Sequence, residues 1–247
     1  AGELVGLYRD RGPEIFSQSL WQRLRSLRGV FDETYSARNL ERVLAGYFKT
    51  RTLADCRVPV MVTAYALERR QTVFLKSFHP EHQGVTCTAA ARATSAAPTF
   101  FEPASVDIAG AEHALIDGGV FINAPSVSAY AEALSLYPGD DIHVVSLGTG
   151  QLTRPIDAQR AAQWGTAGWI VPLLDCMFDG VAQVTDHQMR LFLGDRYTRM
   201  QLTLDTASDD MDDASVENIR ALEAAALALI GRERDTLDGL IARLKAL

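Results

Sequence analysis

The sequence predicts an α/β protein built as a three-layer α/β/α sheet, because strand-like and helix-like segments alternate along the chain. The run 58–67, VPVMVTAYAL, is rich in β-branched residues and almost continuously apolar, as a strand covered on both faces is expected to be. The run 141–150, DIHVVSLGTG, has the same character and ends in glycines. In such sheets, binding and catalytic sites lie beyond the carboxyl ends of strands.

Helical spacing of apolar residues predicts the helices, and short apolar or alternating runs predict the strands. Pro98 is expected to end the helix of small residues before it, whereas Asn123 and Pro125 indicate the start of another. The expected helices cover residues 1–16, 38–48, 88–98 and 125–137, and a long helix or a helix pair covers 214–247. The expected strands cover residues 58–67, 71–78, 113–117, 141–150 and 196–204.

No internal repeat or low-complexity linker divides the chain, so we expect a single domain over residues 1–247. Residues 151–247 are expected to form a mostly helical extension of that domain. The chain opens directly in a helical pattern and without Met, so we expect further sequence upstream of Ala1.

The composition is that of an ordinary globular protein, with 47% hydrophobic and 22% charged residues. The formal net charge of −7 argues against a nucleic-acid partner, because the basic excess that attracts phosphates is missing. Cys56, Cys87 and Cys176 are widely spaced and odd in number, which favours a reducing compartment over a disulfide framework or a CxxC metal site. No signal peptide and no transmembrane-length apolar run is visible, so we expect a cytoplasmic location, with peripheral membrane contact as an option.

The stretch 114–125, ALIDGGVFINAP, supports two interpretations of Asp117. An Asp-Gly pair between apolar runs is a strong hairpin signal, because both central residues of that turn must accept positive φ. Alternatively, an acid at the end of a buried strand has a tunable pKa, and the glycines after it let a substrate or another backbone come close. The second interpretation requires VFINAP to lead into a helix rather than a return strand. Local chemistry leaves both interpretations open.

Three segments in order, AARATSAAPTFFEP (90–103), LIDGGVFINAP (115–125) and VVSLGTG (144–150), resemble the patatin-like phospholipases. That family has an Ala-rich block, then a DGG or DGA motif, an asparagine-proline helix start and a strand ending in SLGTG. The opening ELVGLYRDRGPEIF is similar to the helix that the family places just after its nucleophile. The resemblance covers residues 1–150 well and the remainder only loosely.

The resemblance implies a lipid acyl hydrolase in which Asp117 is the catalytic general base of a Ser–Asp dyad, acting without a histidine, a metal or a cofactor. The family's serine sits in a G-x-S-x-G turn, and a glycine-rich loop forms its oxyanion hole. The implied substrate is a phospholipid or another lipid ester. Gly118, Gly119, Asn123 and Pro98 are implied to bind the substrate or shape the site.

The sequence departs from the family in lacking the nucleophile: no G-x-S-x-G and no comparable oxyanion loop occurs in the 247 residues. Ser95 lies in ATSAAP without flanking glycines, and Ser146 lies inside the strand before LGTG. We expect the first strand, the oxyanion loop and the nucleophile elbow to lie upstream, and the chain alone to be inactive. Two alternatives stay open: a non-catalytic patatin-derived binding or regulatory module, and a Ser-His-Asp esterase using His187 or, less favoured because it falls in an expected strand, His143.

The remaining clusters have ordinary structural interpretations. His79 and His82 lack a third ligand at a suitable spacing, so a surface loop is expected rather than a metal site. The glycines of 148–150 are expected to serve strand–helix packing, and the acidic stretch 205–213 to form a solvated loop before the last helix. The apolar stretch 164–181 is interpreted as core or as a contact in a homo-oligomer, with a lid or wall of an acyl-chain pocket as the alternative.

Overall fold

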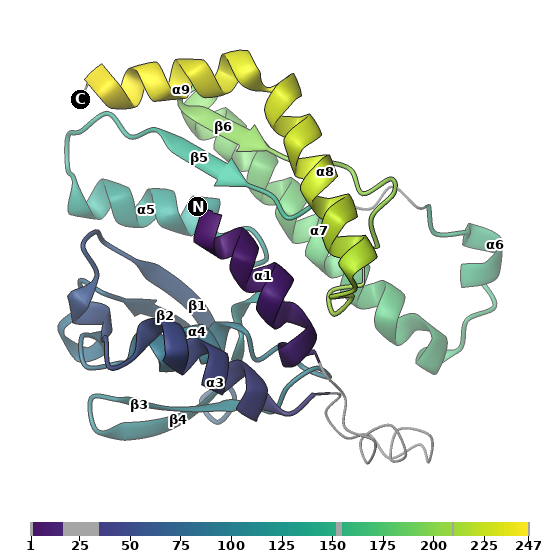
Figure 1. Ribbon diagram of the computed structural model, residues 1–247, viewed down its shortest axis with the longest axis horizontal. Helices are drawn as coiled ribbons and strands as arrows, with labels where there is room; N and C mark the ends of the chain where they lie inside the picture. The colour runs from purple at the N-terminus through teal and green to yellow at the C-terminus, as the bar shows by residue number, and fades with distance from the viewer. Residues whose placement is uncertain (1, 17–34, 152–154, 209, 247) are drawn as a thin grey trace. The chain divides into compact units, whose positions relative to one another are not determined.

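The computed structural model describes residues 2–16, 35–151, 155–208 and 210–246, and it divides after Pro125 into two compact units. The first unit spans residues 1–125 and the second spans residues 126–247 (Figure 1). Both units contain helices and strands, which confirms the α/β class predicted from the sequence. That the two units form a single domain stays a prediction.

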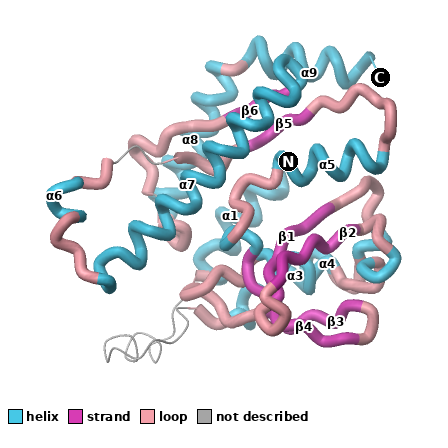
Figure 2. The backbone as a smooth tube through the Cα atoms, turned by 180° about the vertical axis from the view of Figure 1, so that it is seen from behind, coloured by secondary structure: helices cyan, strands magenta, loops and turns pink. Residues whose placement is uncertain are grey.

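The first unit is a four-stranded antiparallel sheet with a helix packed across it (Figures 1 and 2). Helix α4 packs against β1, β3 and β4, helix α3 packs against α4, and helix α1 packs against α3. The strands, in the order β2-β1-β4-β3, are β1 (Met61–Ala66), β2 (Gln71–Lys76), β3 (Ala104–Ile108) and β4 (Ala111–Asp117). The helices are α1 (Gly2–Ile15), α3 (Ala37–Phe48) and α4 (Cys87–Thr94), with short 3₁₀ helices η1 (Leu53–Asp55), η2 (Pro80–His82) and η3 (Gly118–Val120).

Small side chains explain how α4 fits closely against the sheet. Ala64 of β1 is buried together with Leu75 of β2 and Leu115 of β4, and none of the three has measurable exposure. Ala90 and Ala93 of α4 belong to the same buried cluster. Alanines on the helix let its backbone approach the strands, so that the leucines are removed from water. This burial stabilises the fold by about 25 cal/mol per Å² of apolar surface.

The opposite face of β1 and β2 carries larger rings. Phe121, directly after η3, packs against Tyr65 of β1 and Phe74 of β2, with ring centroids 6.3 and 5.9 Å apart. These side chains are half-buried, so β1 is deeply covered only on the α4 side and not equally on both faces as the apolar run suggested. The aromatic contacts hold the segment after Asp117 against the sheet.

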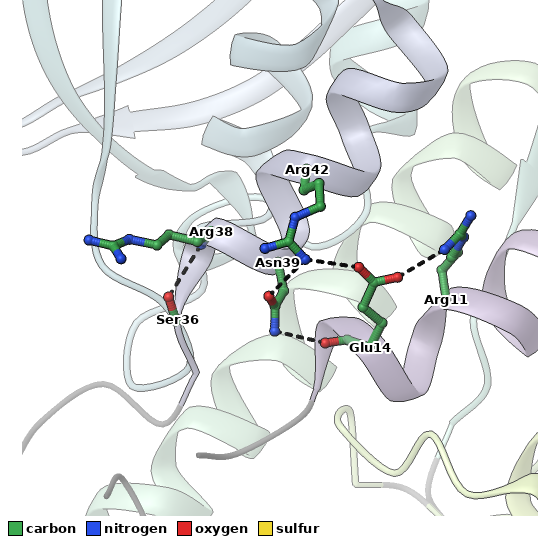
Figure 3. A network of polar contacts seen from close by, with 6 residues as sticks. All are labelled: Arg11, Glu14, Ser36, Arg38, Asn39 and Arg42. Carbon is green, nitrogen blue, oxygen red and sulfur yellow. Dashed lines mark hydrogen bonds and ion pairs between the residues drawn. The ribbon is translucent and has the colours of Figure 1, made fainter.

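Polar contacts attach α1 to α3 (Figure 3). Asn39 donates a hydrogen bond to the backbone carbonyl oxygen of Glu14 at 3.0 Å, and the Glu14 carboxylate pairs with Arg42 at 3.1 Å and with Arg11 at 3.0 Å. Ser36 caps the N-terminus of α3. The helix expected at the start of the chain is therefore confirmed, and its last turn is anchored to its neighbour.

The second unit contains a two-stranded parallel sheet with helices beside it. Strand β5 (Val144–Leu147) pairs with β6 (Tyr197–Met200), with Val144 opposite Tyr197. Met189 and Leu193 are buried against Tyr197 and form the core of this unit. The helices are α5 (Ser126–Leu136), α6 (Ala158–Ala161), α7 (Thr166–Leu193), α8 (Val216–Arg232) and α9 (Arg234–Ala246), with a 3₁₀ turn, η4 (Gly194–Arg196), before β6. The pair α8 and α9 confirms the helix-pair interpretation of residues 214–247.

Two local predictions are corrected by the structure. Strand β3 was not expected, and the hairpin that joins it to β4 turns at Ala109 and Gly110, which have φ of 53° and 84°. Positive φ at both central residues is what a type I′ turn requires. The sequence places His143 within a strand, but it lies just before β5, where it is exposed and pairs with Asp141 at 3.2 Å.

Helix α7 takes up most of the apolar stretch 164–181 and continues well beyond it. Trp169, Leu173 and Met177 are 38%, 49% and 50% exposed, which disfavours the core interpretation of this stretch. The subunit-contact and lid interpretations stay predictions. Within the part of the sequence that the structure describes, no helix is both long and apolar enough to cross a bilayer.

Candidate active site

Asp117 is the last residue of β4, and its backbone is held by two neighbouring elements. Its N–H donates to the C=O of Ala96, just beyond α4, at 3.0 Å, and the sheet places it opposite Ala64 of β1. The polypeptide then continues into η3 rather than into a return strand. The hairpin interpretation of the Asp-Gly pair is therefore wrong, and the acid ends a strand as the alternative interpretation requires.

The Asp117 carboxylate is oriented by the turn that follows it. The N–H of Gly119 donates to Oδ1 at 2.7 Å, the geometry of an Asx turn. Within the described residues, Oδ2 has no hydrogen-bond partner. One oxygen is thus held in place and the other is available to accept a proton.

The two glycines after Asp117 leave space for different neighbours. A Cβ at Gly118 would lie 2.3 Å from Oγ1 and 2.7 Å from the carbonyl carbon of Thr63, so only glycine lets β1 pass at this distance. A Cβ at Gly119 would lie 3.2 Å from Oδ1 of Asp117. The first glycine admits a neighbouring backbone and the second leaves room for the carboxylate, while a role for either in binding substrate stays a prediction.

Burial raises the pKa of Asp117 above its ordinary value of 3.8, because the charged carboxylate loses hydration. The hydrogen bond from Gly119 favours the charged form and has the smaller effect on the pKa. A carboxylate with a raised pKa accepts a proton more readily than a solvated one. This property suits a general base.

The raised pKa makes the stability of the protein depend on pH. Between the ordinary pKa of 3.8 and the higher folded-state value, the folded protein binds more protons than the unfolded protein, so the contribution of Asp117 to the free energy of unfolding falls as pH rises. The melting temperature of Asp117→Asn minus that of the wild type should therefore increase as pH rises from about 3.5 to about 7. Thermal melts of both proteins across this range measure the difference. Asp141 and Asp213, whose pKa values are lowered, are present in both proteins and cancel. A difference that stays constant with pH would contradict the raised pKa.

The other predicted site residues lie in three different segments. Pro98 is exposed in the turn between α4 and β3. Helix α4 ends at Thr94, so Pro98 forms this turn and does not itself end the helix as predicted. Asn123 is exposed between η3 and α5, and His187 lies in α7 of the second unit.

Three supporting residues were not identified from the sequence. Ala96 accepts the N–H of Asp117 with its backbone C=O, and Thr63 lies beside Gly118 with its side chain and its carbonyl carbon. Neither an alanine nor a threonine is distinctive at these positions, so no sequence signal marks them. Arg92 of α4 is 4% exposed; it donates to the C=O of Glu102 at 2.7 Å and pairs with Glu41 of α3 at 3.2 Å. The available signal was a single arginine in a run of small residues. Arg92 connects α4 to α3 through Glu41 and to the segment before β3 through Glu102.

The serines considered as nucleophiles have structural roles. The N–H of Ser95 caps the C-terminal end of α4. The buried Ser146 hydroxyl accepts hydrogen bonds from Ser126 at 3.0 Å and from Arg199 at 2.7 Å. Neither arrangement resembles an exposed serine at a strand-to-helix turn.

The polar clusters also have structural roles. The Nδ1 atom of His82 accepts the backbone N–H of Lys76 at 3.1 Å, and burial lowers the pKa of His82. Among the residues that the structure describes, no group of three or more His, Cys, Asp or Glu side chains is placed to hold a metal ion. In the acidic stretch, Asp213 accepts the N–H of Ser215, which caps α8. The loop before the last helices is therefore confirmed.

The fold and the site together define an α/β protein with a desolvated aspartate at the end of a strand. Two glycines follow it: the first lies against the neighbouring strand β1, and the second leaves room for the carboxylate. A family model described as patatin-like phospholipase matches residues 4–130, more than half of the chain. The chain belongs to the patatin-like phospholipase family, as its motifs predicted. At the level of that family, it is related to lipid acyl hydrolases.

Relatives from plants and bacteria extend the similarity beyond the matched region. Patatin-like protein 3 of Arabidopsis thaliana is 27% identical over 88% of this chain and 58% of its own length. The cGAMP-activated phospholipase of Pseudomonas aeruginosa is 26% identical over 95% of this chain and 69% of its own. Probable inactive patatin-like protein 9 of Arabidopsis thaliana is 29% identical over 76% of this chain and 56% of its own. The chain thus spans little more than half the length of two of these three relatives.

Proposed function

We propose that this chain supplies the general base of a lipid acyl hydrolase, with Asp117 as the acid of a Ser–Asp dyad. The observation that carries the proposal is the carboxylate at the end of β4, where burial raises its pKa and Gly119 holds only one of its oxygens. Family membership supports a phospholipid or another lipid ester as the substrate class. Such a substrate implies that the protein works in contact with a membrane or another lipid surface.

The proposed reaction uses Asp117 twice. Oδ2 accepts the proton of a serine hydroxyl as the serine oxygen attacks the ester carbonyl, and the acid then gives that proton to the leaving alcohol. The resulting acyl-enzyme is hydrolysed when Asp117 takes a proton from an attacking water and returns it to the serine. No G-x-S-x-G occurs in these 247 residues, so the serine is proposed to lie outside them.

A dyad and a triad are distinguished by His187→Ala. In a dyad no histidine handles the proton, so the variant should keep kcat/KM within about threefold of the wild type. In a triad, loss of the histidine costs orders of magnitude in rate. The measurement is fatty-acid release from phosphatidylcholine vesicles by the protein that carries this chain together with its serine. A loss of about 10³-fold in the His187 variant would favour the esterase mechanism over the dyad.

The same assay tests the proposed function itself. Release of fatty acid that is blocked by a serine-directed fluorophosphonate is the expected result. A folded protein that releases no fatty acid from any lipid ester, and that the fluorophosphonate does not label, would instead favour a non-catalytic module of the same family. The relative named as probably inactive makes that control necessary.

A further inference from the structure

Two of the three cysteines lie on segments that are hydrogen-bonded to each other in the first unit. The N–H of Leu53 donates to the C=O of Val85 at 2.8 Å, and the N–H of Cys87 donates to the C=O of Arg51 at 2.8 Å. Cys87 is the first residue of α4, and Cys56 directly follows η1, in the loop that leads to β1. The backbone therefore brings together two positions that are far apart in the sequence.

The two thiols face the same small region. The turn of η1, closed by a hydrogen bond from the N–H of Cys56 to the C=O of Leu53, folds Cys56 back towards the second segment. The Cys87 thiol donates to the C=O of Thr52, the residue just before η1, at 3.2 Å, and the nearby Cys56 thiol, at the other end of η1, helps to raise the pKa of Cys87. Both cysteines are half-buried, and Cys56 packs against the core cluster of the sheet. Cys176, by contrast, is exposed on α7 of the second unit.

We propose that Cys56 and Cys87 form a modification site, a dithiol that a hydroperoxide oxidises to an intramolecular disulfide. The thiolate of one cysteine attacks an oxygen of the peroxide, so that an S–O bond forms and the O–O bond breaks. The cysteine becomes a sulfenic acid, and the rest of the peroxide takes up a proton and leaves as an alcohol, or as water where the peroxide is hydrogen peroxide. The second thiol then attacks that sulfur, the S–S bond forms, and a molecule of water leaves. The peroxide accepts the two electrons. This site is independent of the function proposed for Asp117.

The environment assigns different roles to the two sulfurs. Burial and the neighbouring Cys56 thiol raise the pKa of Cys87, so at neutral pH Cys87 holds less of the reactive thiolate than an ordinary cysteine does. The sulfenic acid therefore forms on Cys56, and Cys87 resolves it. Because a resolving thiol must also lose its proton, disulfide formation should accelerate as pH rises.

The disulfide joins the loop before β1 to the first turn of α4. It closes a loop of about 30 residues that contains β1 and β2, a length at which a cross-link restricts the unfolded polypeptide substantially. The expected consequence is a rise of about 10 °C in melting temperature on oxidation, reversed by a thiol reductant.

The test treats the purified protein with hydrogen peroxide and counts free thiols, with peptide mapping of the wild-type protein to locate any S–S bond. The three free thiols should fall to one, with Cys56 linked to Cys87 and no dimer on non-reducing gels. Cys176→Ser should leave the disulfide and the rise in melting temperature intact, whereas Cys56→Ser should abolish both. In Cys87→Ser, a dimedone probe should label Cys56. Survival of all three thiols, linkage through Cys176, or sulfinic and sulfonic products without an S–S bond would overturn the proposal.

Discussion

Asp117→Asn is expected to lower kcat for lipid-ester hydrolysis by about 10³-fold in the protein that carries this chain together with its serine. Asparagine has nearly the same shape, and its amide oxygen can still accept the N–H of Gly119, which holds Oδ1 at 2.7 Å in the wild type. It cannot accept the serine proton. Because the proton transfer belongs to the transition state, kcat and kcat/KM should fall by the same factor, with KM unchanged.

Asp107→Asn is the matched control for this experiment. Asp107 also accepts a backbone N–H, that of Gly110 at 3.0 Å, but it is exposed on the β3–β4 hairpin. Its replacement should leave kcat within about twofold of the wild type. Full activity in an Asp117 variant that is folded at the assay temperature would remove Asp117 from the mechanism.

The sequence identified most elements of the first unit because their patterns are local. Strands β1 and β2 stand out as β-branched apolar runs, and α4 as a run of alanines. Strand β3 was missed because it is only five residues long and includes Asp107 and Ser105 on its exposed face. Its turn at Ala109 and Gly110 lacks the Asn-Gly or Asp-Gly pair that marks most such hairpins.

The Asp-Gly pair at Asp117 shows the limit of local patterns. Its composition fits a hairpin turn as well as a strand end, and the structure decides through two contacts from distant segments. The N–H of Asp117 bonds to Ala96, and Thr63 of β1 closes off the space beside Gly118. Neither contact involves a distinctive side chain at the other end, so neither is visible in the order of residues. The family motifs, rather than the local turn chemistry, favoured the correct interpretation.

Gly118→Ala is expected to be the most destabilising single-methyl change at the site, costing about 3 kcal/mol of unfolding free energy. The new Cβ would lie 2.3 Å from Oγ1, 2.5 Å from Cβ and 2.7 Å from the carbonyl carbon of Thr63. The last of these atoms is backbone in the middle of β1, so it cannot move without disturbing the sheet. The melting temperature should fall by roughly 10 °C in thermal denaturation.

Gly84→Ala separates this clash from the general effect of replacing a glycine. A Cβ at Gly84 has no atom within 4 Å, so its stability should change by less than about 0.5 kcal/mol. Thr63→Ala should not rescue the Gly118 variant, because the Cβ and the carbonyl carbon of residue 63 both remain in place. Rescue would mean that the hydroxyl alone causes the clash and that β1 can yield.

Activity should respond to the Gly118 change more steeply than stability does. Relief of the clash requires β4 and β1 to separate at the residue next to Asp117, and this displaces the carboxylate from the position that Gly119 and Ala96 define. A shift of about 1 Å in a catalytic group costs about 10²-fold in rate. Measured well below its melting temperature, the variant should therefore be folded and yet lose about 10²-fold in kcat. A folded variant with full activity would show that Oδ2 does not need this placement to accept a proton.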